Sequence, residues 1–135
     1  MKGNEVIADV LMWTVDYQPV AALLRYTAED PFAVTLDFVD DAGRVTASYR
    51  FARTLLTARV WQPVAVVPCD LVVIDPAREP GTTSFILALD HDTLPMAFLT
   101  ETAPLVEFLR DSYEVIPPGS EGYHLDMDSI IAGGS

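Results

Sequence analysis

A chain of 135 residues, half of them hydrophobic, is long enough to bury a core without disulfides, and we expect one domain over residues 1–135. Its 20 acidic and 8 basic residues give a net charge of −12, which disfavours binding to nucleic acid and to anionic membranes. Cys69 is the only cysteine, and the sequence shows neither a signal-peptide cleavage pattern nor an apolar run that could span a membrane. These features predict a cytoplasmic location without direct membrane insertion.

The first half of the chain predicts four strands followed by a helix. Apolar or alternating runs predict the strands, at residues 5–15, 20–26, 32–39 and 44–51. Asp40-Asp41-Ala42-Gly43 is typical of a hairpin turn between the last two. Apolar residues at helical spacing then predict a helix over 53–60.

The first predicted strand is apolar on both faces. One face carries Val6, Ala8, Val10 and Met12, and the other carries Ile7, Leu11, Trp13 and Val15. A strand of an antiparallel sheet usually has one polar face. We therefore expect this strand to be packed on both sides, and we expect another chain to cover part of the apolar surface.

The second half repeats the same order of elements. Short apolar runs predict four strands, at 64–67, 71–74, 84–89 and 96–100, before a helix over about 103–113. The fold class is therefore α+β, mainly antiparallel sheet, with two four-strand-plus-helix halves. Its core is expected over about residues 5–116, with a C-terminal tail over 117–135.

Three groups of residues could carry chemistry, and each has a simpler interpretation. His124, Asp126 and Asp128 alternate and could hold a divalent metal, but an acidic tail is the simpler prediction. Asp90-His91-Asp92 could support acid–base catalysis, but this segment is typical of a turn. Cys69 lies between apolar runs without a basic neighbour, which favours a buried thiol over a nucleophile. We therefore predict no enzyme, no metal site and no cofactor.

Large aromatic and arginine side chains are the candidates for contacts with partner proteins, because such residues dominate interface energetics. Core packing is the alternative for the aromatic residues. Arg25 could instead brace the Asp30-Pro31 turn, whereas Arg53 at the start of a helix is harder to explain within the fold, because a cation is unfavourable there. The candidate partner or oligomer contacts are Trp13, Tyr17, Arg25, Tyr26, Arg53 and Trp61.

Several segments, in order along the chain, resemble the SsgA-like family. Leu24–Val34 is similar to a family segment with Leu-Arg-Tyr, an acidic turn and Asp-Pro-Tyr-Ala-Val, and Phe51–Leu56 is similar to Phe-Ala-Arg-Asp-Leu-Leu. Ile116–Glu121 is similar to Val-Pro-Pro-Gly-Thr-Glu, and 124–128 to a His-x-Asp-x-Asp tail. Together these segments span most of the chain, from about Leu24 to Asp128.

The resemblance implies a whirly-like fold with two four-stranded sheets, a homotrimer, and a regulator of sporulation-specific cell division in actinobacteria. It implies a place at the division septum and partners among cell-division proteins, namely SsgA-like paralogues and the tubulin-like GTPase FtsZ. Two other functions remain open from the residues: a whirly-like module that binds single-stranded nucleic acid, which the acidic charge disfavours, and a metal-dependent enzyme that uses His124, Asp126 and Asp128.

Overall fold

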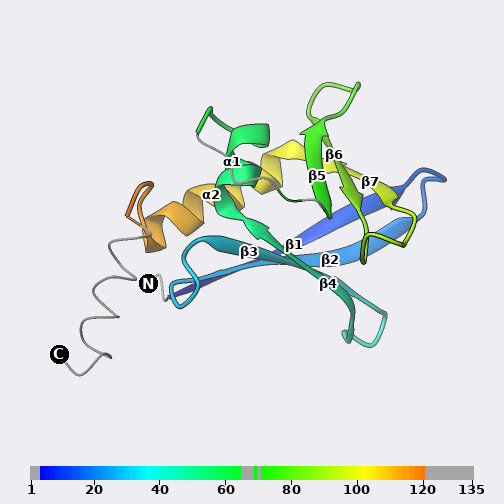
Figure 1. Ribbon diagram of the computed structural model, residues 1–135, viewed down its shortest axis with the longest axis horizontal. Helices are drawn as coiled ribbons and strands as arrows, with labels where there is room; N and C mark the ends of the chain where they lie inside the picture. The colour runs from blue at the N-terminus through cyan, green and yellow to red at the C-terminus, as the bar shows by residue number, and fades with distance from the viewer. Residues whose placement is uncertain (1–3, 65–68, 70, 121–135) are drawn as a thin grey trace.

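The computed structural model describes residues 4–64, 69 and 71–120, and over these it contains one seven-stranded antiparallel sheet and two helices (Figure 1). The strands are β1 (Glu5–Thr14), β2 (Pro19–Thr27), β3 (Ala33–Val39), β4 (Val45–Ala52), β5 (Val72–Pro76), β6 (Thr82–Leu87) and β7 (Met96–Glu101). The helices are α1 (Arg53–Val60) and α2 (Thr102–Val115). The α+β class and the predominance of antiparallel sheet are confirmed.

The two halves do not form separate four-stranded sheets. Strand order is β4-β3-β2-β1-β7-β6-β5, so β1 lies in the centre and joins both halves. It pairs with β2 along nearly its whole length and with β7 through Met12–Thr14, while the Thr100 hydroxyl donates to the carbonyl of Leu11 at 2.7 Å. The predicted strand at 64–67 falls outside the described residues except for Val64, which is in no strand.

The sheet curls strongly, as contacts between distant strands show. The rings of Phe38 in β3 and Phe98 in β7 have centroids 4.9 Å apart, although β2 and β1 separate these strands in the sheet. The ring of Phe51 in β4 similarly lies 6.5 Å from that of Phe85 in β6. The curl gives the sheet a concave inner face and an opposite outer face.

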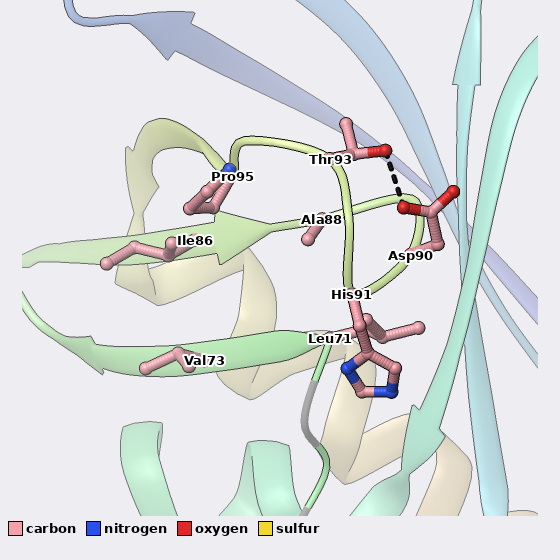
Figure 2. A pocket seen from close by; sticks show the side chains of 8 residues that line it. All are labelled: Leu71, Val73, Ile86, Ala88, Asp90, His91, Thr93 and Pro95. Atoms are coloured by element: carbon pink, nitrogen blue, oxygen red, sulfur yellow. Dashed lines mark hydrogen bonds between the residues drawn. The ribbon is translucent and has the colours of Figure 1, made fainter.

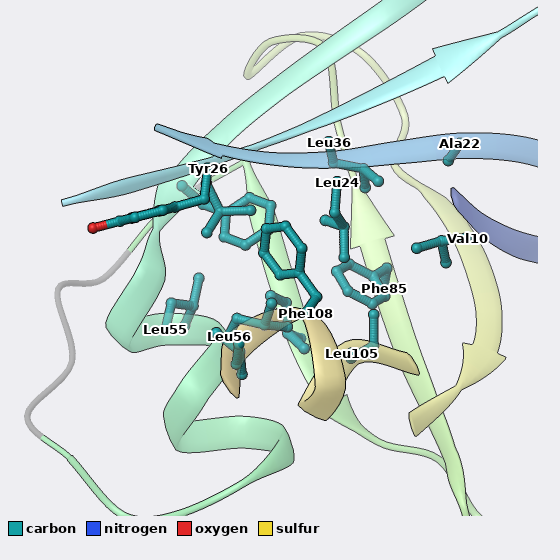
Figure 3. Packing of buried hydrophobic residues seen from close by; sticks show 14 of the residues in the cluster. Val10, Ala22, Leu24, Tyr26, Leu36, Leu55, Leu56, Phe85, Leu105 and Phe108 are labelled. Atoms are coloured by element: carbon teal, nitrogen blue, oxygen red, sulfur yellow. The ribbon is translucent and has the colours of Figure 1, made fainter. Parts of the chain in front are cut away.

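The hydrophobic core lies between the inner face and the helices. Phe108 of α2 is 1% exposed and packs near Leu24 and Tyr26 of β2 and Phe85 of β6 (Figure 3). Leu56 of α1 is buried in the same cluster. The apolar stripe of each helix therefore faces the sheet, as expected for amphipathic helices.

The arginine that braces the β2–β3 connection is not Arg25, as the sequence suggests, but Arg50. Asp30 accepts two hydrogen bonds from Arg50 of β4, both at 2.9 Å. Arg25 instead pairs with the buried carboxylate of Asp37 at 3.0 Å. Arg25 and Arg50 lie opposite Thr35 on either side of β3, so each guanidinium reaches a different carboxylate.

Candidate protein-interaction surfaces

Tyr26 and Arg53, two of the candidate contact residues, lie inside the molecule. The guanidinium of Arg53 lies between the rings of Tyr26 and Tyr113, with its carbon 4.5 Å and 4.0 Å from their centroids. Its Nη1 donates to the carbonyls of Ser112 at 3.1 Å and Ile116 at 2.9 Å. Arg53 is 0% exposed and Tyr26 1% exposed, so neither presents a surface to a partner.

Arg53 has a structural role that explains a cation at a helix start. It begins α1, but its charge meets carbonyls at the C-terminal end of α2, where a cation is favourable. The side chain thus ties the start of one helix to the end of the other. The Tyr26 hydroxyl, beside it, donates to the carbonyl of Pro31 at 3.0 Å and holds the β2–β3 connection.

The remaining candidates are at least partly exposed. Tyr17 is 78% exposed in the β1–β2 turn, where it adopts a φ of 62°. Together with Trp13 it lines a cavity of about 280 Å³ that also includes Leu99 of β7. Arg25 lies on the outer face. Trp61 lies apart from these, just after α1, with its ring 5.8 Å from that of Tyr113 and 38% of its surface exposed.

The outer face carries a band of apolar side chains that we term the outer stripe. The register places these side chains on the same side of neighbouring strands, with Trp13 opposite Leu99 and Ile86 opposite Val73. The stripe consists of Ile7, Leu11, Trp13, Leu23, Leu99, Ile86 and Val73. Ile7 is 54% and Leu11 49% exposed. The predicted packing on both sides of the first strand is therefore wrong for the single chain, because the helices cover only the inner face.

A shallow pocket of about 240 Å³ lies beside the outer stripe, against the segment between β6 and β7 (Figure 2). Its wall includes Asp90 and His91, but Asp90 is engaged by its own turn: its Oδ1 accepts hydrogen bonds from the Thr93 hydroxyl at 2.7 Å and the Asp92 amide at 2.9 Å. These bonds hold the pKa of Asp90 below its usual range. The turn interpretation of this segment is confirmed.

A second hollow, which we term the open-end groove, lies on the inner face and has a volume of about 290 Å³. Its apolar lining includes Phe38, Tyr49, Phe98 and Met96, together with Leu94 from the β6–β7 segment. Burial raises the pKa of the Tyr49 phenol above its ordinary value. The sequence analysis missed this groove, because only the curl of the sheet brings β3 and β4 opposite β6 and β7.

The metal and nucleophile candidates receive no support from the described residues. His124, Asp126 and Asp128 lie outside them, and within them no three His, Cys, Asp or Glu side chains gather as a metal site would require. Cys69 is half-buried against the core. Over the same part of the chain, neither helix has the length and apolar character needed to cross a membrane.

The described residues form a curled antiparallel sheet backed by two helices, with apolar side chains exposed on the outer face and at the open-end groove. Exposed apolar surface of this kind is typical of a domain that contacts other molecules. The family model described as "Streptomyces sporulation and cell division protein, SsgA" matches residues 20–121. The chain belongs to the SsgA family, as the motifs in the sequence indicate.

Relatives and solved structures agree with this assignment. Sporulation-specific cell division protein SsgB of Salinispora tropica is 35% identical over 84% of this chain and 78% of its own length. SsgB of Streptomyces coelicolor is 32% identical over 84% and 80%. The crystal structure of an SsgA-like sporulation-specific cell division protein from Thermobifida fusca superposes with a TM-score of 0.76, at 26% identity, over 100% of this chain and 98% of that one.

Proposed function

We propose that this protein is a non-enzymatic regulator of sporulation-specific cell division that acts through protein–protein binding. Membership of the SsgA family is the observation that carries this proposal, together with relatives named as sporulation-specific cell division proteins. We place the protein in the cytoplasm at the division septum, with FtsZ and SsgA-like paralogues as its candidate partners. The net charge of −12 supports a protein partner over nucleic acid or a membrane surface.

A fluorescent fusion of the full chain, expressed from its own promoter in the sporulating host, tests this role. We expect the fusion to form bands at sporulation septa, and we expect deletion of the gene to reduce septation. The proposed role would be overturned if the fusion fluoresced uniformly through the cell and the deletion strain septated normally. A fusion that complements the deletion is the necessary control.

We also propose that the protein works as a homo-oligomer, a trimer, held together through the outer stripe. Exposed Ile7 and Leu11 lie on the central strand β1, on either side of Asp9, and exposed apolar side chains gathered on one face mark interaction surfaces. Trp13, Tyr17 and Arg25 lie on or beside the same face and are its proposed anchors. Trp61, beyond this face, remains a separate candidate contact.

Replacing two exposed apolar side chains of the outer stripe should dissociate the oligomer. In the double variant Ile7→Ser with Leu11→Ser, we expect sedimentation velocity at micromolar concentration to show monomers where the parent chain shows trimers, because the stripe loses apolar area that association would bury. The matched control is Leu89→Ser with Leu94→Ser in the open-end groove, which should remain trimeric. A monomeric parent chain, or an outer-stripe variant that stays trimeric, would contradict the proposed interface.

A further inference from the structure

The open-end groove is an apolar hollow that no helix covers in the part of the chain that the structure describes. Neither helix contributes to its lining, which comes from the curled sheet and the segment between β6 and β7. Phe38 and Phe98 are buried and in ring contact within the lining. At the rim, Leu94 is 86% and Leu89 62% exposed. Large apolar side chains gathered at the mouth of a hollow in this way are typical of a binding site.

The turns that bound this groove are strongly acidic. Thr14 and Val20, on either side of the β1–β2 turn, line the groove, and so do residues flanking or within the β3–β4 turn and the β6–β7 segment. Residues 15–18, 40–44 and 88–95 hold five aspartates, against one arginine and one histidine. The aspartates are Asp16, Asp40, Asp41, Asp90 and Asp92. They belong to the turns around the groove and not to its lining, so they act on it through their combined negative field. The only arginine, Arg44, already contacts Asp40 at 3.5 Å, so the field at the rim remains negative.

We propose that the open-end groove binds a short basic segment of a partner protein, whose apolar side chains enter the groove while its Lys or Arg side chains are attracted by the negative field of the surrounding turns. This inference rests on the proposed function, because binding of such a segment would be one of the contacts through which the regulator acts. The negative rim selects against a second copy of this chain, which carries a net charge of −12, and equally against nucleic acid and anionic lipid.

Three synthetic peptides test the chemistry of the occupant. All have the same length; the first combines Leu and Phe with Arg, the second replaces every Arg by Glu, and the third keeps Arg but replaces Leu and Phe by Ala. We expect fluorescence anisotropy with the full chain to show micromolar binding of the first peptide, weakened by salt, and binding of the other two weaker by about tenfold or more. Failure of the first peptide to bind, or equal binding of the Ala peptide, would overturn the proposal.

Two double variants test whether the first peptide binds in the open-end groove. Leu89→Ser with Leu94→Ser removes exposed apolar side chains from the groove without touching the core, and we expect it to weaken the first peptide by about tenfold. Ile7→Ser with Leu11→Ser, on the opposite face, should bind that peptide like the parent chain. The proposal fails if the groove variant binds the first peptide as tightly as the parent chain does, or if both variants lose the same affinity for it.

The same pair of variants separates this inference from the proposed assembly. If the outer-stripe variant stays oligomeric while the groove variant alone loses the peptide, the assembly surface is wrong and the groove proposal stands. If the outer-stripe variant dissociates while neither variant changes peptide binding, the groove proposal fails and the assembly surface stands.

Discussion

Replacing Arg53 by methionine should lower the free energy of unfolding by about 2–4 kcal/mol, a large part of the roughly 5–15 kcal/mol that holds a typical domain folded. Methionine fills much of the space but donates no hydrogen bond, so the buried carbonyls of Ser112 and Ile116 lose their contacts with Nη1. The cation–π contacts with Tyr26 and Tyr113 are lost as well. Urea unfolding followed by circular dichroism measures the change.

Arg59→Met is the matched control, because Arg59 belongs to the same helix but is exposed. Its free energy of unfolding should change by no more than about 0.5 kcal/mol. Both variants are compared at one protein concentration, since assembly adds to apparent stability. An Arg53→Met chain as stable as the control variant would show that the guanidinium does not tie α1 to α2.

Replacing Phe108 by alanine should cost about 3–5 kcal/mol of stability and lower the melting temperature by roughly 10–20 °C. Phe108 is 1% exposed and fills the space between α2 and the inner face, so its removal leaves a cavity that neighbours on β2 and β6 cannot close (Figure 3). Differential scanning calorimetry measures the shift.

Phe32→Ala provides the comparison for Phe108→Ala, because Phe32 is 49% exposed in the connection between β2 and β3. Its melting temperature should fall by clearly less, since much of the ring is already in water. Similar shifts for the two variants would mean that Phe108 does not pack in the core as Figure 3 shows.

Local patterns in the sequence were sufficient to predict most of the secondary structure. The alternation of Val34, Leu36 and Phe38 along β3 marks the buried face directly, and α1 has the bounds that its helical spacing predicts. The arrangement of these elements in one sheet was not predictable in the same way. It depends on pairing between Met12–Thr14 and β7, which no local pattern encodes.

The candidate site was harder to predict for a related reason. Arg53 donates to carbonyls 59 and 63 residues further along the chain, so its neighbours in sequence give no sign of its role. Tyr26 did carry a signal: it shares the phase of buried Ala22 and Leu24, while Arg25 has the opposite phase. The open-end groove has no such signal, because strands from both halves build it.

The central place of β1 has a consequence for biosynthesis. Of the seven described strands, β1 is translated before the others and can pair with β2 at once, whereas its other neighbour, β7, is translated after them all. Until then the edge of β1 at Met12–Thr14 remains unpaired, next to the apolar side chain of Leu11. A nascent chain with such an edge can pair with its neighbours on the same polysome. Closure of the sheet is therefore a late, long-range step of folding, and until it occurs the unpaired edge of β1 is a site for chaperones that bind nascent chains.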